Sequence, residues 1–439
     1  MKVLKFGGTS VGSAQRMKEV AKLITDGEQK IVVLSAMSGT TNTLVEISDY
    51  LYKKNPEGAN EIINKLEAKY KQHVDELYAT QEYKQKGLEV IKSHFDYIRS
   101  YTKDLFTLFE EKVVLAQGEL ISTAMVNFYL QECGVKSVLL PALEFMRTDK
   151  NAEPDPVYIK EKLQAQLELY PDMDIYITQG FICRNAYGEI DNLQRGGSDY
   201  TASLIGAAVN ASEIQIWTDI DGMHNNDPRI VDKTAPVRQL HFEEAAELAY
   251  FGAKILHPTC IQPAKYANIP VRLLNTMDPH APGTLISNDT EKGKIKAVAA
   301  KDNITAIKIK SSRMLLAHGF LRKVFEIFES YQTSIDMICT SEVGVSVTID
   351  NTKHLNEILD DLKKYGTVTV DKEMCIICVV GDLEWENVGF EAKALDAMRD
   401  IPVRMISFGG SNYNISFLIR ECDKKVALQS LSDMLFNGK

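Results

Sequence analysis

Short apolar runs alternate with segments of helical spacing along the first two thirds of the chain. Lys2 to Phe6 and Lys30 to Ser35 are typical of buried strands, and Ser13 to Thr25 between them carries apolar residues at helical spacing. Two strands joined by a helix form a βαβ unit, which implies a parallel sheet. The same pattern predicts further strands at Ser137 to Leu140, Ile175 to Thr178, Glu213 to Thr218 and Val271 to Leu274.

The segment from about Asn42 to Phe109 is rich in Lys, Glu and Tyr at helical spacing, so we expect helices packed on or beside the sheet. Around Asn288 to Lys296 the chain turns polar and charged, which predicts a linker. We therefore place a domain over residues 1–290, with an α/β layer architecture.

The C-terminal part has a β-α-β-α order that occurs twice. The first copy comprises Ile304 to Ile309, Phe320 to Tyr331, Val343 to Ile349 and His354 to Lys364; the second comprises Met374 to Val380, Phe390 to Arg399, Ile415 to Ile419 and Lys424 to Leu435. This order predicts two small βαββαβ-type units, at 300–370 and 371–439, the first interleaved with the second. One irregular α+β domain is the alternative.

Composition excludes several classes of protein. The chain has 439 residues, 45% hydrophobic and 25% charged, which suits a globular protein with more than one core. A net charge of -10 leaves no basic footprint for nucleic acid or an anionic membrane. No uninterrupted apolar stretch approaches the roughly 20 residues of a membrane span, and the N-terminus lacks a signal-peptide pattern, so we expect a cytoplasmic protein.

The seven cysteines are an odd number scattered over a long chain, which indicates reduced thiols rather than a disulfide framework. Cys375 and Cys378 have the spacing of a redox motif, but they lie in an apolar strand-like run, so we expect two buried thiols.

A glycine pair, Gly7-Gly8, follows the first predicted strand. Glycine lets backbone N–H groups approach an anion, so the loop could hold phosphates, although an ordinary tight turn would also need glycine. The loop is neither a Walker A sequence nor a Gly-x-Gly-x-x-Gly fingerprint. Lys5 precedes the glycines as a cation at the strand end.

Three other clusters carry candidate chemistry. In Arg195 to Ala202, a guanidinium beside a second glycine pair could grip a carboxylate, or the cluster could be a solvated charged turn. Trp217 to Gly222 and the following Asn226 to Arg229 lie after a strand, where open α/β sheets bind ligands, although Asp-Gly and Asp-Pro also favour turns. Lys254 is either a phosphate ligand or a lysine at a helix end.

Taken together, these motifs resemble the aspartate kinase family. The resemblance rests on Lys5 to Val11, Gln117-Gly118-Glu119, Arg195 to Asp199, Phe251 to Pro258 and the paired C-terminal units, which resemble ACT domains. It implies an amino-acid kinase αβα sandwich, similar to carbamate kinase, with a mostly parallel sheet, followed by two ferredoxin-like βαββαβ ACT units. It also implies ATP-dependent phosphorylation of the aspartate β-carboxylate, the first step of lysine, threonine and methionine biosynthesis.

The resemblance also implies roles for individual residues. Lys5 would stabilise the phosphoryl group in flight, and Asp199 would hold Lys5 in position. The phosphates would contact Lys5, Gly7, Gly8 and Ser10; the nucleotide would also contact Thr218, Asp219, Arg229 and Lys254. The aspartate pocket would comprise Glu119 for the ammonium, Arg195 for the α-carboxylate, and Ser198 and Thr41. One departure is His224, where family members often carry tyrosine.

The chemistry agrees with these roles. A carboxylate with a pKa near 4 is ionised at neutral pH, so the attack needs no general base and the difficulty is bringing an anion to a polyanion. Cationic groups, backbone N–H donors and Mg²⁺ would reduce this electrostatic repulsion. No compact His/Cys metal motif occurs, so we expect no protein metal site, and Mg²⁺ held by the ATP phosphates and water.

The regulatory half resembles the effector pocket of lysine-sensitive, single-function aspartate kinases. Lysine is thus the expected effector, with its ammonium on Asp336 and Glu342 and its carboxylate near Gly319 and Phe320; the other pocket residues would be Met314, Leu321, Ser334 and Ile335. Without the resemblance, Gly319 would simply start a helix. We expect lysine to bind between ACT units of two subunits, in a homodimer or homotetramer, and the homoserine dehydrogenase half of two-function relatives to be absent.

Two other functions remain open from the sequence. Another amino-acid kinase, acting on acetylglutamate or a nucleotide, would lack the tandem C-terminal units. A non-catalytic amino-acid sensor could retain the kinase domain as a scaffold, although Lys5, Asp199, Glu119 and Arg195 are all in place.

Overall fold

The computed structural model describes residues 1–193, 196–252, 256–289, 291–311 and 318–437. The chain divides into two compact units, Met1–Met223 with Ile255–Asn288, and His224–Lys254 with Asp289–Lys439.

The first unit is built on a mostly parallel sheet. Its strands are β1 (Lys2–Phe6), β2 (Lys30–Leu34), β3 (Ser137–Leu140), β4 (Ile175–Gln179), β7 (Ile214–Thr218), β9 (Val271–Asn275) and β10 (Thr284–Ser287), in the spatial order β3-β4-β2-β1-β7-β9-β10. Only β10 of these strands runs antiparallel, to β9, and β5 (Ile182–Arg184) and β6 (Ile190–Asn192) form a separate hairpin. All six strands predicted here from apolar runs are confirmed.

Helices cover both faces of this sheet. The helices of the unit are α1 (Ala14–Ile24), α2 (Thr40–Tyr52), α3 (Pro56–Leu77), α4 (Gln81–Ser100), α5 (Leu108–Glu132), α6 (Ala142–Phe145), α7 (Pro156–Glu168), α8 (Gly197–Ala208) and α10 (Gln262–Tyr266). Leu4 and Phe6 share one large core with α1 to α5, and Lys5, which points to the opposite face, meets α8. The αβα sandwich predicted for this half is therefore confirmed.

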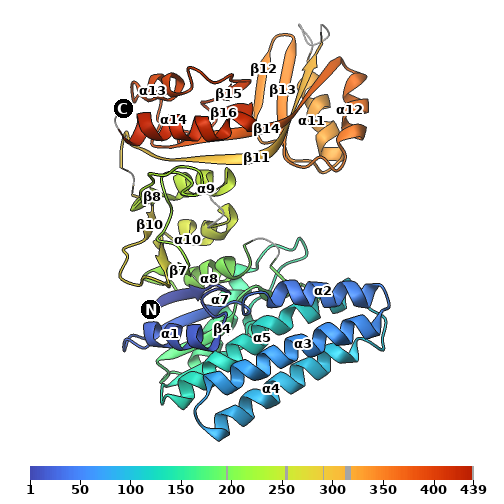
Figure 1. Ribbon diagram of the computed structural model, residues 1–439, viewed down its shortest axis with the longest axis vertical. Helices are drawn as coiled ribbons and strands as arrows, with labels where there is room; N and C mark the ends of the chain where they lie inside the picture. The colour runs from blue at the N-terminus through green and yellow to red at the C-terminus, as the bar shows by residue number, and fades with distance from the viewer. Residues whose placement is uncertain (194–195, 253–255, 290, 312–317, 438–439) are drawn as a thin grey trace. The chain divides into compact units, whose positions relative to one another are not determined.

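Helices α2 to α5 pack side by side in the segment that was expected to be helical (Figure 1). Helix α5 is long and apolar enough to cross a membrane by length and composition alone, and 72% of its most apolar stretch is buried within the protein. Its apolar character is therefore accounted for by packing against neighbouring helices and strands.

The second unit contains an antiparallel sheet in the order β12-β13-β11-β14-β16-β15. Its elements are β8 (Gln239–His241), α9 (Phe242–Tyr250), β11 (Ile295–Lys310), α11 (Phe320–Ser330), β12 (Ile338–Ser341), β13 (Gly344–Ile349), α12 (Leu355–Lys363), β14 (Thr367–Gly381), α13 (Phe390–Ala397), β15 (Met405–Ser407), β16 (Asn414–Arg420) and α14 (Lys424–Phe436). The order of helices and strands matches two ferredoxin-like units, as predicted.

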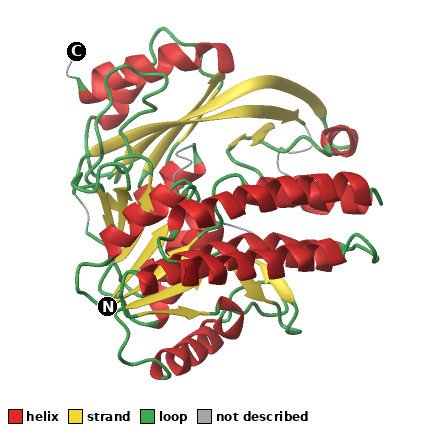
Figure 2. Cartoon of the chain, turned by 60° about the horizontal axis from the view of Figure 1, so that its bottom comes forward, coloured by secondary structure: helices red, strands yellow, loops and turns green. Residues whose placement is uncertain are grey.

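Two long strands, β11 and β14, pass through both ferredoxin-like modules, and Figure 2 shows such long curved strands among the shorter ones. The first half of β11 pairs with the second half of β14, and the second half of β11 pairs with the first half of β14. We call the module containing α11 and α12 the first ACT module, and the one containing α13 and α14 the second. Each has its own apolar core, around Ile307 and Phe417 respectively.

The long strand corrects one sequence expectation. Strand β11 begins at Ile295, whereas the sequence predicted a linker through Lys296 and a strand only from Ile304. Lys296 is buried although it is charged, and its ammonium is paired with Glu291. Pairing of this polar sequence with β14 overrides its low strand propensity.

Both members of the Cys375-x-x-Cys378 pair lie on β14 and are fully buried, and burial raises the pKa of each thiol. The sequence predicted two buried thiols, and burial of this kind keeps a thiol unreactive.

Candidate active site

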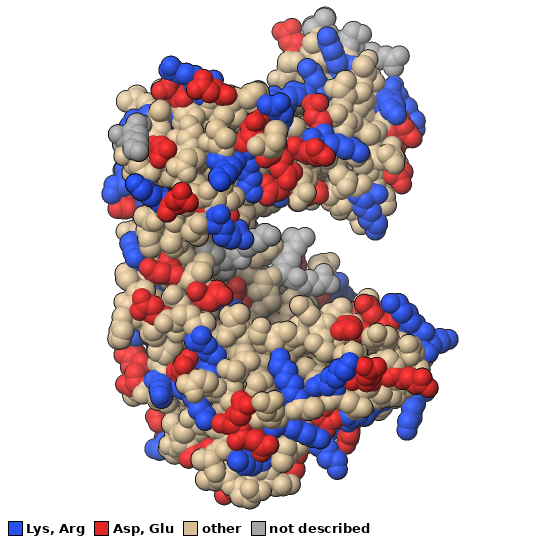
Figure 3. Space-filling model, viewed as in Figure 1, with Lys and Arg blue, Asp and Glu red and all other residues tan. Residues whose placement is uncertain are grey.

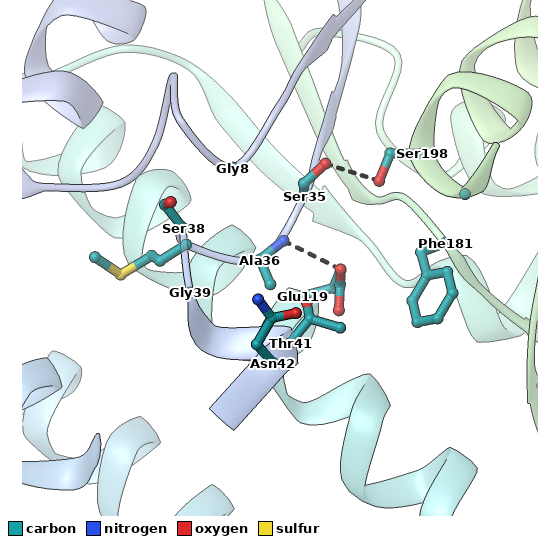
Figure 4. Close-up of a pocket in the computed structure, with 12 residues that line it drawn as sticks. Gly8, Ser35, Ala36, Ser38, Gly39, Thr41, Asn42, Glu119, Phe181 and Ser198 are labelled. Atoms are coloured by element: carbon teal, nitrogen blue, oxygen red, sulfur yellow. Dashed lines mark hydrogen bonds between the residues drawn. The ribbon is translucent and has the colours of Figure 1, made fainter. Parts of the chain in front are cut away.

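The carboxyl ends of the parallel strands β1, β2 and β4 meet at one edge of the sheet of the first unit. The loops that follow them surround a pocket of about 340 Å³ (Figure 4). Its walls comprise Gly8, Ser35, Ala36, Met37, Ser38, Gly39, Thr41, Asn42, Glu119, Phe181, Gly197 and Ser198. The predicted residues Gly8, Thr41, Glu119 and Ser198 are thus brought together.

Lys5 and Asp199 form an ion pair at this edge. The ammonium of Lys5, near the end of β1, lies 2.7 Å from Oδ1 of Asp199, in the first turn of α8, with the two side chains 13% and 16% exposed. Asp199 lies at the positive end of the helix dipole of α8, where a carboxylate interacts favourably with the free backbone N–H groups. The pair therefore presents a positioned, partly desolvated cation beside the glycine loop.

Glycines make the close approaches at the pocket possible. A Cβ on Gly8 would lie 2.9 Å from the carbonyl oxygen of Ala36, and one on Gly180 would lie 2.3 Å from Oγ of Ser198. Gly196 has a φ of +68°, and a Cβ there would overlap the sulfur of Cys260. Larger residues would push these loops apart.

Glu119 is the buried acid of the pocket. It is 3% exposed, and its Oε1 accepts a hydrogen bond from the backbone N–H of Ala36 at 3.1 Å. Its Oε2 has no hydrogen-bond partner within the part of the chain that the structure describes. Burial raises the pKa of this carboxyl to about 7. An unpaired buried oxygen of this kind suits a cationic ligand group.

Serine hydroxyl groups also line the pocket. Ser35, at the end of β2, donates its hydroxyl hydrogen to Oγ of Ser198 at 2.8 Å, and Figure 4 shows these two side chains facing each other. Phe181 closes one side, with a φ of +68° that is unusual for an aromatic residue. Its backbone N–H donates to Oγ1 of Thr201 at 3.0 Å, which holds the conformation.

The sequence reasoning did not select Ser35, Met37, Ser38, Asn42 or Phe181. A signal was present, because Ser35 to Gly39 directly follows a strand and consists of small residues apart from Met37, and Gly180 directly follows another strand. Such runs at strand ends mark loops that can approach a ligand.

The expected nucleotide residues fall in three places. Thr218 and Asp219 lie at the end of β7, next to β1, where Trp217 stacks on Phe6 at 5.6 Å between ring centroids. Ser10 is fully buried, and its hydroxyl contacts Oγ1 of Thr276 at 2.9 Å, so its phosphate contact stays a prediction. Arg229 belongs to the second unit, where it forms a two-point contact with Asp227.

Arg195, Lys254 and Met314 lie outside the described residues. Of the other expected effector residues, Gly319 precedes α11 with a φ of +83°, Phe320 is buried, and Leu321, Ser334 and Glu342 are exposed. Ile335 packs against the first module's core. The Asp336 side chain is only 1% exposed and is bound to Lys301 and Tyr250.

Among the described residues, no group of three His, Cys, Asp or Glu side chains could hold a metal ion. His224, where the family often has tyrosine, lies with Nδ1 3.0 Å from Oγ1 of Thr234.

Comparison with known proteins agrees with this geometry. Residues 1–275 match the Amino acid kinase family and residues 377–435 match the ACT domain. The chain therefore belongs to the amino acid kinase family.

Relatives that align with nearly the whole chain are aspartokinases. The chain is 36% identical to "Aspartokinase 1, chloroplastic" of Arabidopsis thaliana, covering 99% of this chain and 80% of the relative. It is 33% identical to "Lysine-sensitive aspartokinase 3" of Escherichia coli, over 99% of both. A crystal structure of Escherichia coli aspartokinase III with aspartate and ADP superimposes with a TM-score of 0.85 at 32% identity, covering 99% of this chain and 100% of the other.

Proposed function

We propose that the protein transfers the terminal phosphoryl group of ATP to the β-carboxylate of L-aspartate. The observation that carries this proposal is the Lys5–Asp199 pair beside a pocket with an unpartnered buried carboxyl oxygen. The similarity to aspartokinases over nearly the whole chain supports it.

The pocket suits a small amino acid with two carboxylates. Oε2 of Glu119 would accept the α-ammonium, which would remove the penalty of leaving that oxygen unpaired. Ser198 and Thr41 would donate to carboxylate oxygens, and Arg195 would grip the α-carboxylate at two points. The β-carboxylate would then face the loop after β1.

Catalysis would consist of positioning and charge stabilisation. The aspartate β-carboxylate is ionised at neutral pH, so no residue has to remove a proton before the attack. Lys5 would neutralise the charge that spreads over the phosphoryl oxygens in the transition state, and Asp199 would keep the ammonium aimed there. Backbone N–H groups of Gly7 and Gly8 would contact the neighbouring phosphates.

Thr218, Asp219, Arg229 and Lys254 would bind the rest of the nucleotide. ATP would enter as its Mg²⁺ complex, in which phosphate and water oxygens supply most of the metal ligands. When bound, Mg²⁺ would neutralise part of the phosphate charge, and the carboxylates of Asp199, in the first turn of α8, and Asp219, directly after β7, could contact it.

A hydroxamate assay with purified protein and ATP tests the activity. We expect hydroxamate with aspartate, and none with acetylglutamate or with ATP alone. Product with acetylglutamate instead would identify another amino-acid kinase, and no product with any acid would identify a non-catalytic sensor on a kinase scaffold.

We also propose that lysine is the feedback effector and that it binds to the first ACT module. Oδ2 of Asp336 is buried and has no hydrogen-bond partner in the described part of the chain, so it could accept an ammonium, as Glu342 nearby in sequence could. Similarity to a lysine-sensitive aspartokinase supports this choice. Activity titrated separately against lysine and threonine tests it; indifference to both would refute it.

Assembly and location complete the proposal. We propose a homodimer or homotetramer formed through the ACT modules, because an effector held between subunits could then shift both kinase sites. We propose a cytoplasmic location, where the cysteines stay reduced. Light scattering of the purified protein tests the assembly, and a monomer at micromolar concentration would contradict it.

A further inference from the structure

Thr276 directly follows β9 and lies between two parts of the proposed nucleotide site. Its Oγ1 donates a hydrogen bond to the carbonyl oxygen of Thr218 at 2.6 Å, and its backbone N–H reaches the same oxygen at 2.8 Å. Ser10, in the loop after β1, is 2.9 Å from the same Oγ1.

The direction of each hydrogen bond follows from counting hydrogens. A threonine hydroxyl has one hydrogen, and a carbonyl oxygen can only accept, so the Thr276 hydroxyl donates its hydrogen to the carbonyl oxygen of Thr218. Ser10 must therefore donate to Thr276. This chain of bonds is buried, since Ser10 is 0% and Thr276 8% exposed, so water cannot replace its members readily.

We propose that Thr276 is a positioning residue for ATP, with no contact to the reacting atoms. Its hydroxyl fixes the loop after β1, which follows Lys5, to the end of β7, where Thr218 and Asp219 would bind the nucleotide. This inference rests on the proposed ATP-dependent activity.

Thr276→Val tests the inference, because valine keeps the shape and removes the hydroxyl. We expect kcat/KM for ATP to fall about 5- to 30-fold, the effect of one to two lost hydrogen bonds, while KM for aspartate changes less than about twofold. Thr276→Ser, which keeps the hydroxyl, should restore ATP kinetics.

Two further variants separate positioning from stability. Thr348→Val removes a buried hydroxyl that accepts the N–H of Met337 in the second unit, so it should lose stability without changing ATP kinetics. Ser10→Ala should lower kcat/KM for ATP, and combining it with Thr276→Val should add little, because both remove the same bond.

Unchanged ATP kinetics in Thr276→Val or in Ser10→Ala would overturn the inference and leave the proposed activity intact. Equal losses for ATP and aspartate would also overturn it. If wild-type protein makes no acyl phosphate from any acid, the proposed activity itself fails.

A separate observation concerns Asp336, in the first ACT module. Its Oδ1 accepts hydrogen bonds from the Tyr250 hydroxyl and from the Lys301 ammonium, both at 2.7 Å. Lys301 also pairs with Asp350 at 2.9 Å and lies 4.3 Å from the Tyr250 ring centroid. The Asp336 carboxylate, which is proposed to bind the effector through Oδ2, is therefore already hydrogen-bonded to α9 through Oδ1.

Tyr250 is the last residue of α9, and Gly252 follows two positions later. Gly252 lies close against β11, since a Cβ there would lie 2.2 Å from the carbonyl oxygen of Ala300. We infer that Tyr250 transmits effector binding at Asp336 to helix α9, and thereby to kinase activity. This inference rests on the proposed regulation by lysine.

Tyr250→Phe separates binding from its consequence, because the ring and its contact with Lys301 remain while the hydroxyl is lost. We expect the Kd for lysine, measured by calorimetry, to change less than about threefold, because only one hydrogen bond to a residue beside the ligand is lost. Inhibition at saturating lysine should weaken clearly. Tyr331→Phe is the matched control, since its hydroxyl donates to Asp361 elsewhere in the same module.

Full inhibition of Tyr250→Phe by lysine would overturn this inference alone. Loss of lysine binding in that variant would overturn it too, because Tyr250 would then be a binding residue. Wild-type protein that binds no lysine would refute the proposed regulation and this inference together.

Discussion

At the scale of single residues, Glu119 shows how burial prepares a side chain for its ligand. The carboxyl has one backbone donor and one oxygen without a partner, and burial raises its pKa to about 7. In the unliganded protein, the Glu119 carboxyl therefore lowers the free energy of unfolding as the pH rises from its ordinary pKa of 4.5 to about 7. The cause is that the unfolded chain loses this proton more readily than the folded state does. An ammonium beside it reverses that preference.

We therefore expect aspartate affinity to rise with pH up to about 7 and then to level off. Below that pH, Glu119 must lose its proton to pair with the ammonium, so affinity should fall up to about tenfold per pH unit. Aspartate Kd by calorimetry at several pH values measures this, with proton release seen in buffers of different ionisation enthalpy. Glu119→Gln should bind weakly without the pH dependence; an unchanged profile in that variant would contradict the assignment.

Lys5→Ala should lower kcat by on the order of 10² or more, because it removes the cation aimed at the phosphoryl group. The fold should persist, as the lost ion pair lies at the edge of the sheet; circular dichroism and a thermal melt check this. Asp199→Ala should behave similarly. Near-normal kcat in folded Lys5→Ala protein would contradict the mechanism.

The sequence could predict much of this site because its motifs resemble those of the aspartate kinase family and because some of them follow strands, where open α/β sheets bind ligands. Lys5, Gly8, Thr41, Glu119 and Ser198 were selected and lie at the pocket or its edge. The hydrogen bond between the hydroxyl groups of Ser10 and Thr276 could not be predicted, since the two residues are 266 positions apart in the chain. The unusual backbone of Phe181 likewise depends on Thr201, from a different element.

At the scale of elements, prediction succeeded where periodicity was strong and failed where tertiary pairing decided. Strands with continuous apolar runs, such as β2 and β4, were found because both faces are buried. Strands β12 and β15 were missed because they are short, partly exposed edge strands. The early start of β11 was missed because its neighbours Ile295 and Ala297 pair with β14, far along the chain, and the charge of Lys296 is compensated by Glu291.

Ile307→Ala should destabilise the first ACT module by about 2–5 kcal/mol, because Ile307 is fully buried on β11 in that module's core. Urea unfolding followed by hydrogen exchange in α11 and α12 measures it. Ile338→Ala, on the partly exposed neighbouring strand β12, should cost less than about 1 kcal/mol. Basal kinase activity should be retained in both variants, and equal destabilisation would contradict the description of this core.

At the scale of the whole molecule, charge gives no sign of a polymeric partner. The net charge is -10, and on the face shown in Figure 3 acidic and basic side chains are interspersed. Selectivity for anionic substrates must therefore come from local groups such as the Lys5–Asp199 pair.

Lysine should stabilise the folded protein if it binds the native first ACT module. At a concentration of 100 Kd, the gain in unfolding free energy is about 2.7 kcal/mol for one site. Thermal or urea denaturation with lysine, and with threonine as the matched control, measures this. A larger shift with threonine than with lysine would contradict the proposed effector.

The shared strands β11 and β14 also constrain how this protein can change over evolutionary time. A gene segment for residues 377–435, which covers the ACT domain match, leaves out the half of β11 that pairs with β14 in the second module. Duplicating, deleting or exchanging that segment alone would leave one sheet with a missing strand and another with a surplus one. The two modules are therefore expected to be gained, lost and recombined as a single heritable block.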